Sequence, residues 1–395
     1  MVYAGGGTGG HVVPSLAVAS VMRQRGHEAL FIGTRRGLEA KLAPQAGFPI
    51  EWIEIGGLNR VGVAQTLWTL WHLPRSVWRS WAILRYGNPA AVFSMGGYVA
   101  APVVVAAILR RVPVVVMEPN AMPGLVSRSL SRFVWRALVA FDEARAFFPE
   151  GRSEVCGLPV RQEFFEVGDL QQSEVFTVLL TGGSRGARAL NRIARECWPL
   201  LAKALSGQPA EVATAPDDAG EIAKPERGLD VPPVAQESVP AATVAPVSIR
   251  WIHQSGLDEF ELMQAAFAES GLDGQVAPFF PNMAAEYARA DLIISRSGAG
   301  AVAEIAAAGR PAILVPFPFA ADDHQKHNAQ AFERAGAALL FDQAGLTGQK
   351  LCDAIVALAK DPARRREMGR NARVLAHHGA ARRAADVLEE AAAAR

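Results

Sequence analysis

The chain has 395 residues and is 50% hydrophobic, which provides enough apolar surface for two or three domains with cores of their own. Its cysteines, Cys156, Cys197 and Cys352, are far apart and follow no metal-binding spacing, so we expect buried thiols in a reducing compartment. No segment resembles a signal peptide, and the longest apolar runs are too short to span a bilayer. The sequence therefore indicates a soluble or peripheral protein.

The net charge of +1 is unevenly distributed along the chain. Residues 1–160 hold 16 Lys and Arg against 9 Asp and Glu, a surplus of 7 positive charges. This surplus indicates either an anionic partner or a basic, solvated surface. No nucleic-acid-binding motif accompanies it, so we do not expect nucleic acid to be that partner.

In chain order, the first predicted elements are a short strand over residues 1–4, a glycine-rich turn and a helix that begins near His11. Glycines let a ligand approach the backbone, and the start of the helix presents unpaired N–H groups to an anion. A histidine there can accept a proton near neutral pH, so the pattern favours a phosphate- or sugar-binding site with a general base. The alternatives are a plain tight turn and a structural histidine. The full dinucleotide-binding pattern, glycines followed by an acid about twenty residues on, is absent, since Glu39 comes late and follows Arg35 and Arg36.

Short apolar runs then alternate with amphipathic segments, as in a doubly wound α/β sheet. The predicted strands are residues 29–32, 91–94, 112–117 and 137–141, and residues 15–25 are a predicted helix. The pattern restarts with a strand over residues 175–180 and a second glycine turn. We therefore expect two similar α/β domains, joined near residues 157–163, with ligands bound at the carboxyl ends of the strands.

Residues 67–85 hold four of the eight tryptophans, together with several arginines. This composition favours a surface that lies on anionic lipid, and core packing is the alternative. We expect Pro74 to start a second helix within the segment.

Residues 206–248 interrupt the alternation. They hold seven prolines and seven acids against two bases, and no aromatic residue. Because such a segment buries too little apolar area to offset the entropy of ordering it, we expect a disordered insertion. The alternation resumes with a strand over residues 249–253, and the last thirty residues are predicted to be helical.

Three features of the second half suggest polar ligand contacts. A helix that follows the predicted strand over residues 292–294 carries Glu304, which can accept hydrogen bonds from both hydroxyls of a ribose; an acid favoured by the helix dipole is the alternative. Residues 322–328 combine Asp and His without a standard zinc spacing, so sugar contacts are favoured over metal. Phe280 lies in a loop that could face a base or belong to the core.

Six motifs together carry a specific resemblance, and they are residues 5–11, 94–98, 118–120, 157–161, 181–187 and 296–299. In this order and spacing the chain resembles the MurG family, bacterial N-acetylglucosaminyltransferases of glycosyltransferase family 28. The resemblance covers nearly the whole chain except residues 206–248.

The resemblance implies a GT-B fold, in which two Rossmann-like doubly wound domains face each other across a cleft. Residues 1–160 would form the acceptor and membrane-side domain, residues 161–375 the UDP-GlcNAc-binding domain, and residues 376–395 a helix that packs back on the first domain. The implied reaction is the inverting transfer of N-acetylglucosamine from UDP-GlcNAc to the 4-hydroxyl of the MurNAc of lipid I (undecaprenyl-pyrophosphoryl-MurNAc-pentapeptide), which forms lipid II for peptidoglycan.

The implied partners are UDP-GlcNAc, lipid I, an anionic membrane surface and proteins of cell-wall synthesis and division. The implied location is the cytoplasmic face of the bacterial inner membrane, held peripherally. We expect no tightly bound cofactor and no metal.

Matching the family's motifs residue by residue gives His11 as the catalytic base. The implied donor contacts are Thr8, Gly9, Gly10, Asn120, Arg161, Ser184, Phe280, Ala299, Gly300, Ala301, Val302, Ala303, Glu304 and Gln325. The implied acceptor side is Gly96, Gly97 and Tyr98. The implied membrane-docking residues are Trp68, Trp71, Arg75, Trp78 and Arg79. Pro119 departs from the family, which usually has Gln there, and should stiffen the loop before Asn120.

Four other functions compete with this one. A UDP-sugar epimerase of the same fold would need no lipid surface. A nicotinamide-dependent oxidoreductase would need the full dinucleotide-binding pattern that is absent. A non-catalytic adaptor would need no histidine beside the glycine turn. A diacylglycerol glycosyltransferase is the nearest rival among the transferases.

Overall fold

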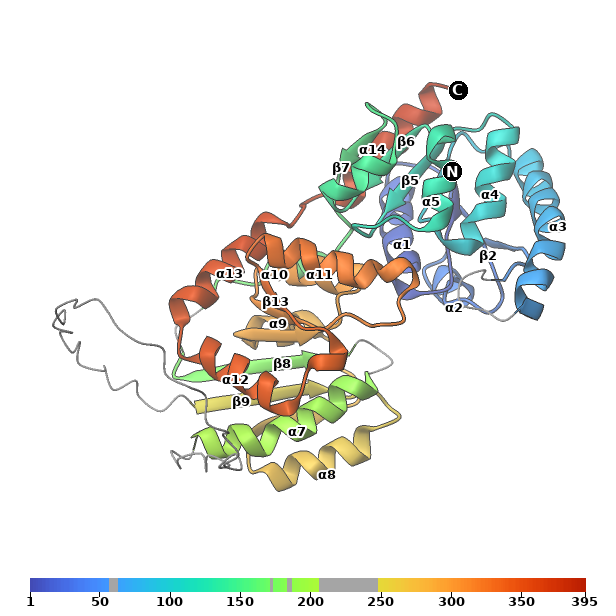
Figure 1. Cartoon of the computed structure of the whole chain (residues 1–395). Coiled ribbons are helices and arrows are strands. Elements are labelled where there is room, and N and C mark those ends of the chain that lie inside the picture. Colours follow the sequence, from blue (N-terminus) through green and yellow to red (C-terminus); the bar gives the residue numbers. More distant parts are fainter. Residues whose placement is uncertain (57–62, 171–172, 183–186, 206–247) are drawn as a thin grey trace, which may run out of the picture.

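The structure is a computed structural model, and it describes residues 1–56, 63–170, 173–182, 187–205 and 248–395, with the backbone alone for residues 63–70. These residues form two α/β domains, each built on one wholly parallel sheet (Figure 1). The predicted doubly wound class is therefore confirmed. The predicted insertion over residues 206–248 lies outside the described residues, apart from Ser248.

The N-terminal domain holds a seven-stranded sheet in the order β3-β2-β1-β4-β5-β6-β7. Its strands are β1 (Val2–Ala4), β2 (Leu30–Gly33), β3 (Ile50–Trp52), β4 (Val92–Ser94), β5 (Val114–Glu118), β6 (Arg136–Val139) and β7 (Ser153–Val155). Its helices are α1 (Gly9–Gln24), α2 (Glu39–Gln45), α3 (Val63–Gly87), α4 (Gly97–Leu109) and α5 (Leu125–Leu130), with 3-10 turns η1 (Ser131–Phe133) and η2 (Asp142–Phe147). The strand order reverses between β1 and β4, so the loops after these two strands open a crevice at the carboxyl edge of the sheet.

The C-terminal domain repeats this plan with a six-stranded sheet in the order β10-β9-β8-β11-β12-β13. Its strands are β8 (Val175–Thr181), β9 (Ser248–Gln254), β10 (Asp273–Ala277), β11 (Leu292–Ser295), β12 (Ala312–Leu314) and β13 (Ala338–Leu340). Its helices are α6 (Gln162–Phe165), α7 (Arg188–Leu205), α8 (Phe260–Ser270), α9 (Met283–Arg289), α10 (Ala299–Ala308), α11 (His324–Arg334), α12 (Gly348–Ala359) and α13 (Pro362–Val374), with η3 (Ala321–Asp323) and η4 (Gln343–Gly345). The reversal lies between β8 and β11, so the loops after these strands open the second half of the crevice.

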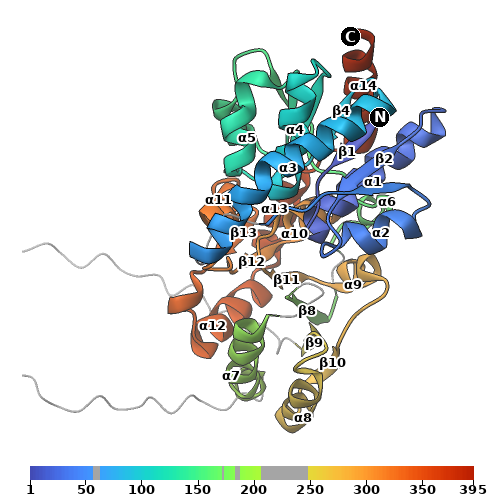
Figure 2. The same ribbon diagram turned by 90° about the vertical axis from the view of Figure 1, so that its right-hand side faces the viewer.

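Alternate residues of each central strand enter different cores, as expected for a parallel sheet covered on both faces. In β1, Val2 and Ala4 pack with residues of α3 and α4, whereas Tyr3 packs with residues of α1. Figures 1 and 2 show α3 and α4 side by side on the outside of the N-terminal domain. The opposite face is covered by α1 together with the C-terminal helix.

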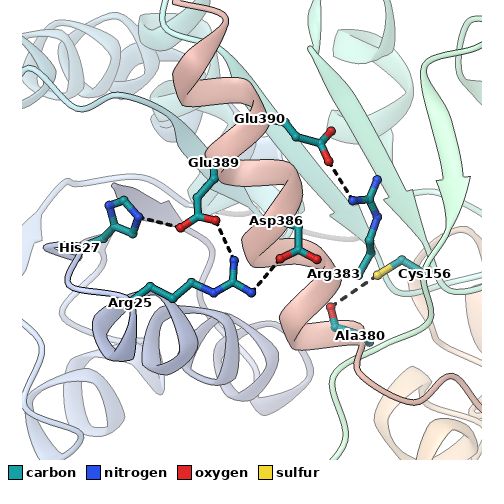
Figure 3. A network of polar contacts seen from close by, with 8 residues as sticks. All are labelled: Arg25, His27, Cys156, Ala380, Arg383, Asp386, Glu389 and Glu390. Atoms are coloured by element: carbon teal, nitrogen blue, oxygen red, sulfur yellow. Dashed lines mark hydrogen bonds and ion pairs between the residues drawn. The ribbon is translucent and has the colours of Figure 1, made fainter.

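That last helix, α14 (Ala380–Ala393), returns to the N-terminal domain (Figure 1). Its apolar face is buried with that domain's core, and ion pairs hold its polar side (Figure 3). Arg25 contacts Asp386 at 2.7 Å and Glu389 at 2.8 Å. Arg383 also contacts Glu154 at 2.7 Å. The chain therefore crosses between the domains twice, near residues 156–161 and again before α14.

Helix α3 is continuous from Val63 to Gly87 with Pro74 inside it, so the expectation that Pro74 starts a second helix is wrong. Pro74 lies on the exposed side, where a helix tolerates the loss of one backbone bond because water can serve the freed carbonyl. Two residues after Pro74, the Ser76 hydroxyl donates to the carbonyl of His72 at 3.0 Å. Within the described residues, no helix is long and apolar enough to cross a bilayer.

Candidate functional site

A cavity of about 340 Å³ lies between the domains at the carboxyl edges of both sheets. The N-terminal domain contributes the glycine loop after β1, and the C-terminal domain contributes the loops after β9, β10 and β11. The predicted donor contacts that line it are Gly9, Gly10, Arg161, Phe280, Gly300, Ala301 and Glu304. Arg161 and Glu304 therefore line one cavity with Gly9 and Gly10, although they are far from these glycines in sequence.

Two glycine loops of the N-terminal domain pack against each other at the mouth of this crevice. Gly7 has a φ of +87° and Gly97 a φ of +74°, a conformation that favours glycine. A Cβ at Gly97 would lie 3.6 Å from Cε1 of His11, and one at Gly7 would lie 3.6 Å from the hydroxyl of Tyr98. The predicted base and the predicted acceptor-side residues are thus brought into one place.

His11 lies in the first turn of α1 and is half-buried. Its Nδ1 is 3.3 Å from Oγ1 of Thr8, the residue that precedes the helix. Burial lowers the pKa of His11, and the charge of His324 across the cleft lowers it further, whereas the Gly6 backbone and the Glu39 carboxylate act in the opposite direction. The ring is consequently neutral at pH 7 and able to accept a proton.

The segment that carries His324 reaches toward the N-terminal domain in a strained conformation. Asp322 and Asp323 have φ values of 51° and 48°, which non-glycine residues rarely adopt. Arg128 of the N-terminal domain contacts Asp322 at 3.1 Å. This ion pair holds the segment at the cleft and places His324 opposite His11.

Glu304 lies in α10 on the far wall of the cavity, half-buried, with Arg161 Nη2 at 3.8 Å. Burial raises the pKa of Glu304 to about 7, and the charge of Arg161 opposes that rise. The first residues of α10 also face the cavity, since Gly300 and Ala301 line it. A helix N-terminus there is suited to bind phosphate.

Asn120 does not line the cavity and instead joins the two domains. Its N–H and its side-chain amide both donate to Oε1 of Glu118 at 3.2 Å. Asn328 of α11 donates from Nδ2 to Oδ1 of Asn120 at 3.1 Å, and its own Oδ1 accepts from the N–H of Ala121 at 2.9 Å. Burial raises the pKa of Glu118 to about 7.

Other predicted contacts are placed elsewhere around the cleft. Gln325 accepts from the N–H of Phe317 at 2.9 Å, and the N–H of Phe280 is bonded to Gln254 at 3.2 Å. A second cavity of about 480 Å³ on the other side of α10 is lined by Ala299, Val302 and Ala303. Ser184 lies outside the described residues.

The tryptophan segment presents two of its rings to solvent. Trp71 is 76% exposed and Trp78 is 69% exposed, and Arg75 is exposed between them. Trp81 packs against the core instead. Arg79 is also exposed and pairs with Glu51 at 2.9 Å, while the side chain of Trp68 is not described.

Three residues that contact or act on the predicted site were not themselves predicted as site residues. They are Glu39 beside Gly7, Asn328 beside Asn120, and His324 across the cleft from His11. The glycines around Glu39 were a signal in the sequence. Residues 322–328 were expected only to contact sugar, and the roles of Asn328 and His324 across the domain boundary leave no local pattern. Among the described residues, no group of three or more His, Cys, Asp or Glu is arranged to hold a metal ion.

The N-terminal domain model of glycosyltransferase family 28 matches residues 1–139, and its C-terminal domain model matches residues 177–388. A protein of Solibacter usitatus named UDP-N-acetylglucosamine--N-acetylmuramyl-(pentapeptide) pyrophosphoryl-undecaprenol N-acetylglucosamine transferase is 49% identical over 99% of this chain and 96% of its own length. A protein of that name from Myxococcus xanthus is 35% identical over 98% of this chain and 91% of its own length. The crystal structure of Acinetobacter baumannii MurG has a TM-score of 0.75 and 29% identity, with 98% of each chain covered. The two facing domains are therefore a GT-B fold, and the chain belongs to glycosyltransferase family 28, among its MurG members, the UDP-GlcNAc-dependent glycosyltransferases.

Proposed function

We propose that this chain transfers N-acetylglucosamine from UDP-GlcNAc to the 4-hydroxyl of the MurNAc of lipid I, which yields lipid II. The relatives named above carry this reaction in their names. The observation that carries the proposal is the cavity between the domains, in which the glycine loop beside His11 faces Glu304 and Arg161.

In the proposed complex, the sugar nucleotide lies along the C-terminal wall of the cavity. The carboxylate of Glu304 accepts hydrogen bonds from the ribose hydroxyls, and Arg161 beside it adds positive charge. The N–H groups at the start of α10 face the diphosphate, whose negative charge grows as UDP leaves. The loop of residues 183–186, which precedes α7 and holds the predicted donor contact Ser184, lies outside the described residues.

The acceptor hydroxyl approaches from the N-terminal side, past Gly97 and Tyr98. His11 takes the proton of that hydroxyl while the oxygen attacks the anomeric carbon from the face opposite the leaving UDP. One displacement inverts the anomeric configuration, so a single base suffices. The depressed pKa of His11 suits it to this step, because the ring is unprotonated before the acceptor binds.

The exposed face of α3 supports a docking surface for the membrane in which lipid I resides. We call this face, formed by Trp71, Arg75 and Trp78, the α3 face. Residues seven apart lie on one side of a helix, so both rings can enter the interface while the arginine meets anionic headgroups. Attachment at the cytoplasmic face of the inner membrane, next to other proteins of cell-wall synthesis and division, is part of this proposal.

Incubation with radiolabelled UDP-GlcNAc and a lipid I analogue tests the function directly. We expect label in the lipid product and stoichiometric release of UDP. A parallel reaction with diacylglycerol as acceptor tests for a diacylglycerol glycosyltransferase. A reaction without acceptor, followed by analysis of the sugar, tests for an epimerase. Transfer to diacylglycerol but not to the lipid I analogue would contradict the proposal.

A further inference from the structure

Glu39, the first residue of α2, is a fully buried carboxylate with 0% exposure. Its Oε2 accepts the N–H of Gly7 at 2.8 Å. Its Oε1 accepts the N–H of Thr34 at 2.8 Å and the Thr34 hydroxyl at 2.9 Å. The Glu39 side chain thus links the glycine loop, at Gly7, to Thr34 at the end of β2. The N–H of Leu38 also donates to the carbonyl of Gly7 at 3.5 Å.

Three glycines provide the space that this carboxylate occupies. A Cβ at Gly6 would lie 2.3 Å from Oε1 of Glu39, and one at Gly37 would lie 1.9 Å from Oε2. A Cβ at Gly33 would lie 2.4 Å from Cγ of Glu39. None of the three has a positive φ, so their backbone conformation admits alanine and only the space around Glu39 demands glycine.

The same carboxylate acts electrostatically on the predicted base. Four groups act on His11: the Thr8 hydroxyl and the Gly6 backbone from the loop, Glu39 from α2 and His324 from α11. Glu39 raises the pKa of His11, and its charge also contributes to the raised pKa of Tyr98, where burial is the larger cause. Among these four groups, Glu39 supplies the negative charge that favours proton uptake by His11.

We propose that Glu39 is a positioning residue of the transferase, which fixes the glycine loop through Gly7 and stabilises the protonated form of His11 during proton transfer. Glu39 does not touch substrate in this assignment and acts through the loop and the imidazole. The inference rests on the proposed function, because it assumes that His11 removes the acceptor proton.

The test compares Glu39→Gln with Thr34→Val and with Glu150→Gln. Glu39→Gln keeps the size of the side chain and removes its charge. Its NH2 group then faces one of the two N–H groups, of Gly7 or Thr34, from which the wild-type carboxylate accepts a hydrogen bond. Thr34→Val removes one hydrogen bond from the carboxylate and leaves its charge. Glu150 is an exposed carboxylate of the same domain, so Glu150→Gln controls for the change in net charge.

We expect Glu39→Gln to lower kcat by roughly 10- to 100-fold, the scale of a misplaced catalytic group. The acidic limb of the pH profile of kcat/KM should move to lower pH, since the lost negative charge had raised the pKa of His11. Thr34→Val should lower kcat less and leave that limb in place, and Glu150→Gln should match wild type. An acidic limb that stays in place would overturn the proposal, and so would a shift to higher pH, which would mean that the loop had opened and hydrated the imidazole.

Two measurements test the role of Glu39 without an assay of enzymatic activity, so their outcome does not depend on the proposed function. NMR titration of His11 should show a lower pKa in Glu39→Gln than in wild type. Gly37→Ala should lower the melting temperature of wild type but change it much less in a Glu39→Ala background, where the space is free. If the wild-type protein transfers no sugar, the proposed function fails, but these two measurements still show whether Glu39 acts on His11 and fills the space beside Gly37. Equal melting losses in both backgrounds would overturn the proposed glycine cage.

Discussion

Nδ2 of Asn328, in the C-terminal domain, donates a hydrogen bond of 3.1 Å to Oδ1 of Asn120, in the N-terminal domain. The same nitrogen donates to the carbonyl of Ser297 at 3.1 Å, in the loop that leads into α10. One fully buried amide, with 0% exposure, therefore links the loop after β5 to the donor-side loop after β11. Together with the ion pair between Arg128 and Asp322, this link joins the two halves of the cavity.

We predict that Asn328→Ala destabilises the protein and weakens UDP-GlcNAc binding. The substitution leaves the buried N–H of Ala121 without its partner, which costs about 1–3 kcal/mol. Urea unfolding and calorimetry measure the two effects. Asn371→Ala is a matched control, since Asn371 makes a bond of 3.3 Å to Gly336 at the surface of the same domain. Equal losses of stability in both variants would contradict the interdomain role.

We predict that His11→Ala leaves UDP binding nearly intact and lowers turnover by about a hundredfold or more, the usual scale for a general base. His11 lies at the glycine loop on the acceptor side and is absent from the lining of the donor cavity. Steady-state kinetics and calorimetry with UDP measure the two effects separately. Turnover within a few-fold of wild type would remove His11 from the mechanism.

We predict that Glu304→Ala weakens UDP-GlcNAc binding by roughly 1.5–3 kcal/mol, the loss of charge-assisted hydrogen bonds to the ribose. The wild-type affinity should also depend on pH. Glu304 has a pKa of about 7 without ligand, and the ribose hydroxyls favour its ionised form, so binding releases a proton below pH 7.

The expected result is an affinity that falls as the pH drops below 7, by at most about tenfold per pH unit for one proton. Glu304→Gln is the matched control, because it keeps the size and removes the titration. Calorimetry at pH 6, 7 and 8 measures both proteins. A wild-type affinity that is flat across this range would contradict the assignment of the ribose to Glu304.

The central strands could be predicted from the sequence, and the edge strands could not. Strands β1, β2, β4, β5 and β6 read as apolar runs because both of their faces are buried. The strands that sequence reasoning missed include β3, β7, β10 and β13, which are the four edges of the two sheets. Their residues are mostly half-buried or exposed, so they carry no continuous apolar signal.

The site shows the same division between local and distant information. The glycine loop, His11 and Glu304 were predicted because each lies in a short motif with a chemical meaning. Residues 322–328 were expected to contact sugar, but the interdomain role of Asn328 was missed because its partners are about 200 residues away. Glu39 was noticed only as an acid misplaced for dinucleotide binding, although the glycines at 33 and 37 were spaced around it.

The last prediction concerns the α3 face. Changing Trp71 and Trp78 to serine should reduce co-sedimentation with anionic vesicles and leave UDP-GlcNAc binding intact, since each ring buries apolar area at the interface. Arg75 should add on the order of 1 kcal/mol near an anionic surface, a contribution that high salt weakens. Both rings are largely exposed, so the double variant should keep the melting temperature of wild type. Leu257→Ser with Leu262→Ser is the control, because these residues are exposed apolar side chains of the C-terminal domain. Vesicle binding that is unchanged in the tryptophan variant, or equally reduced in the control, would overturn the docking role of the α3 face.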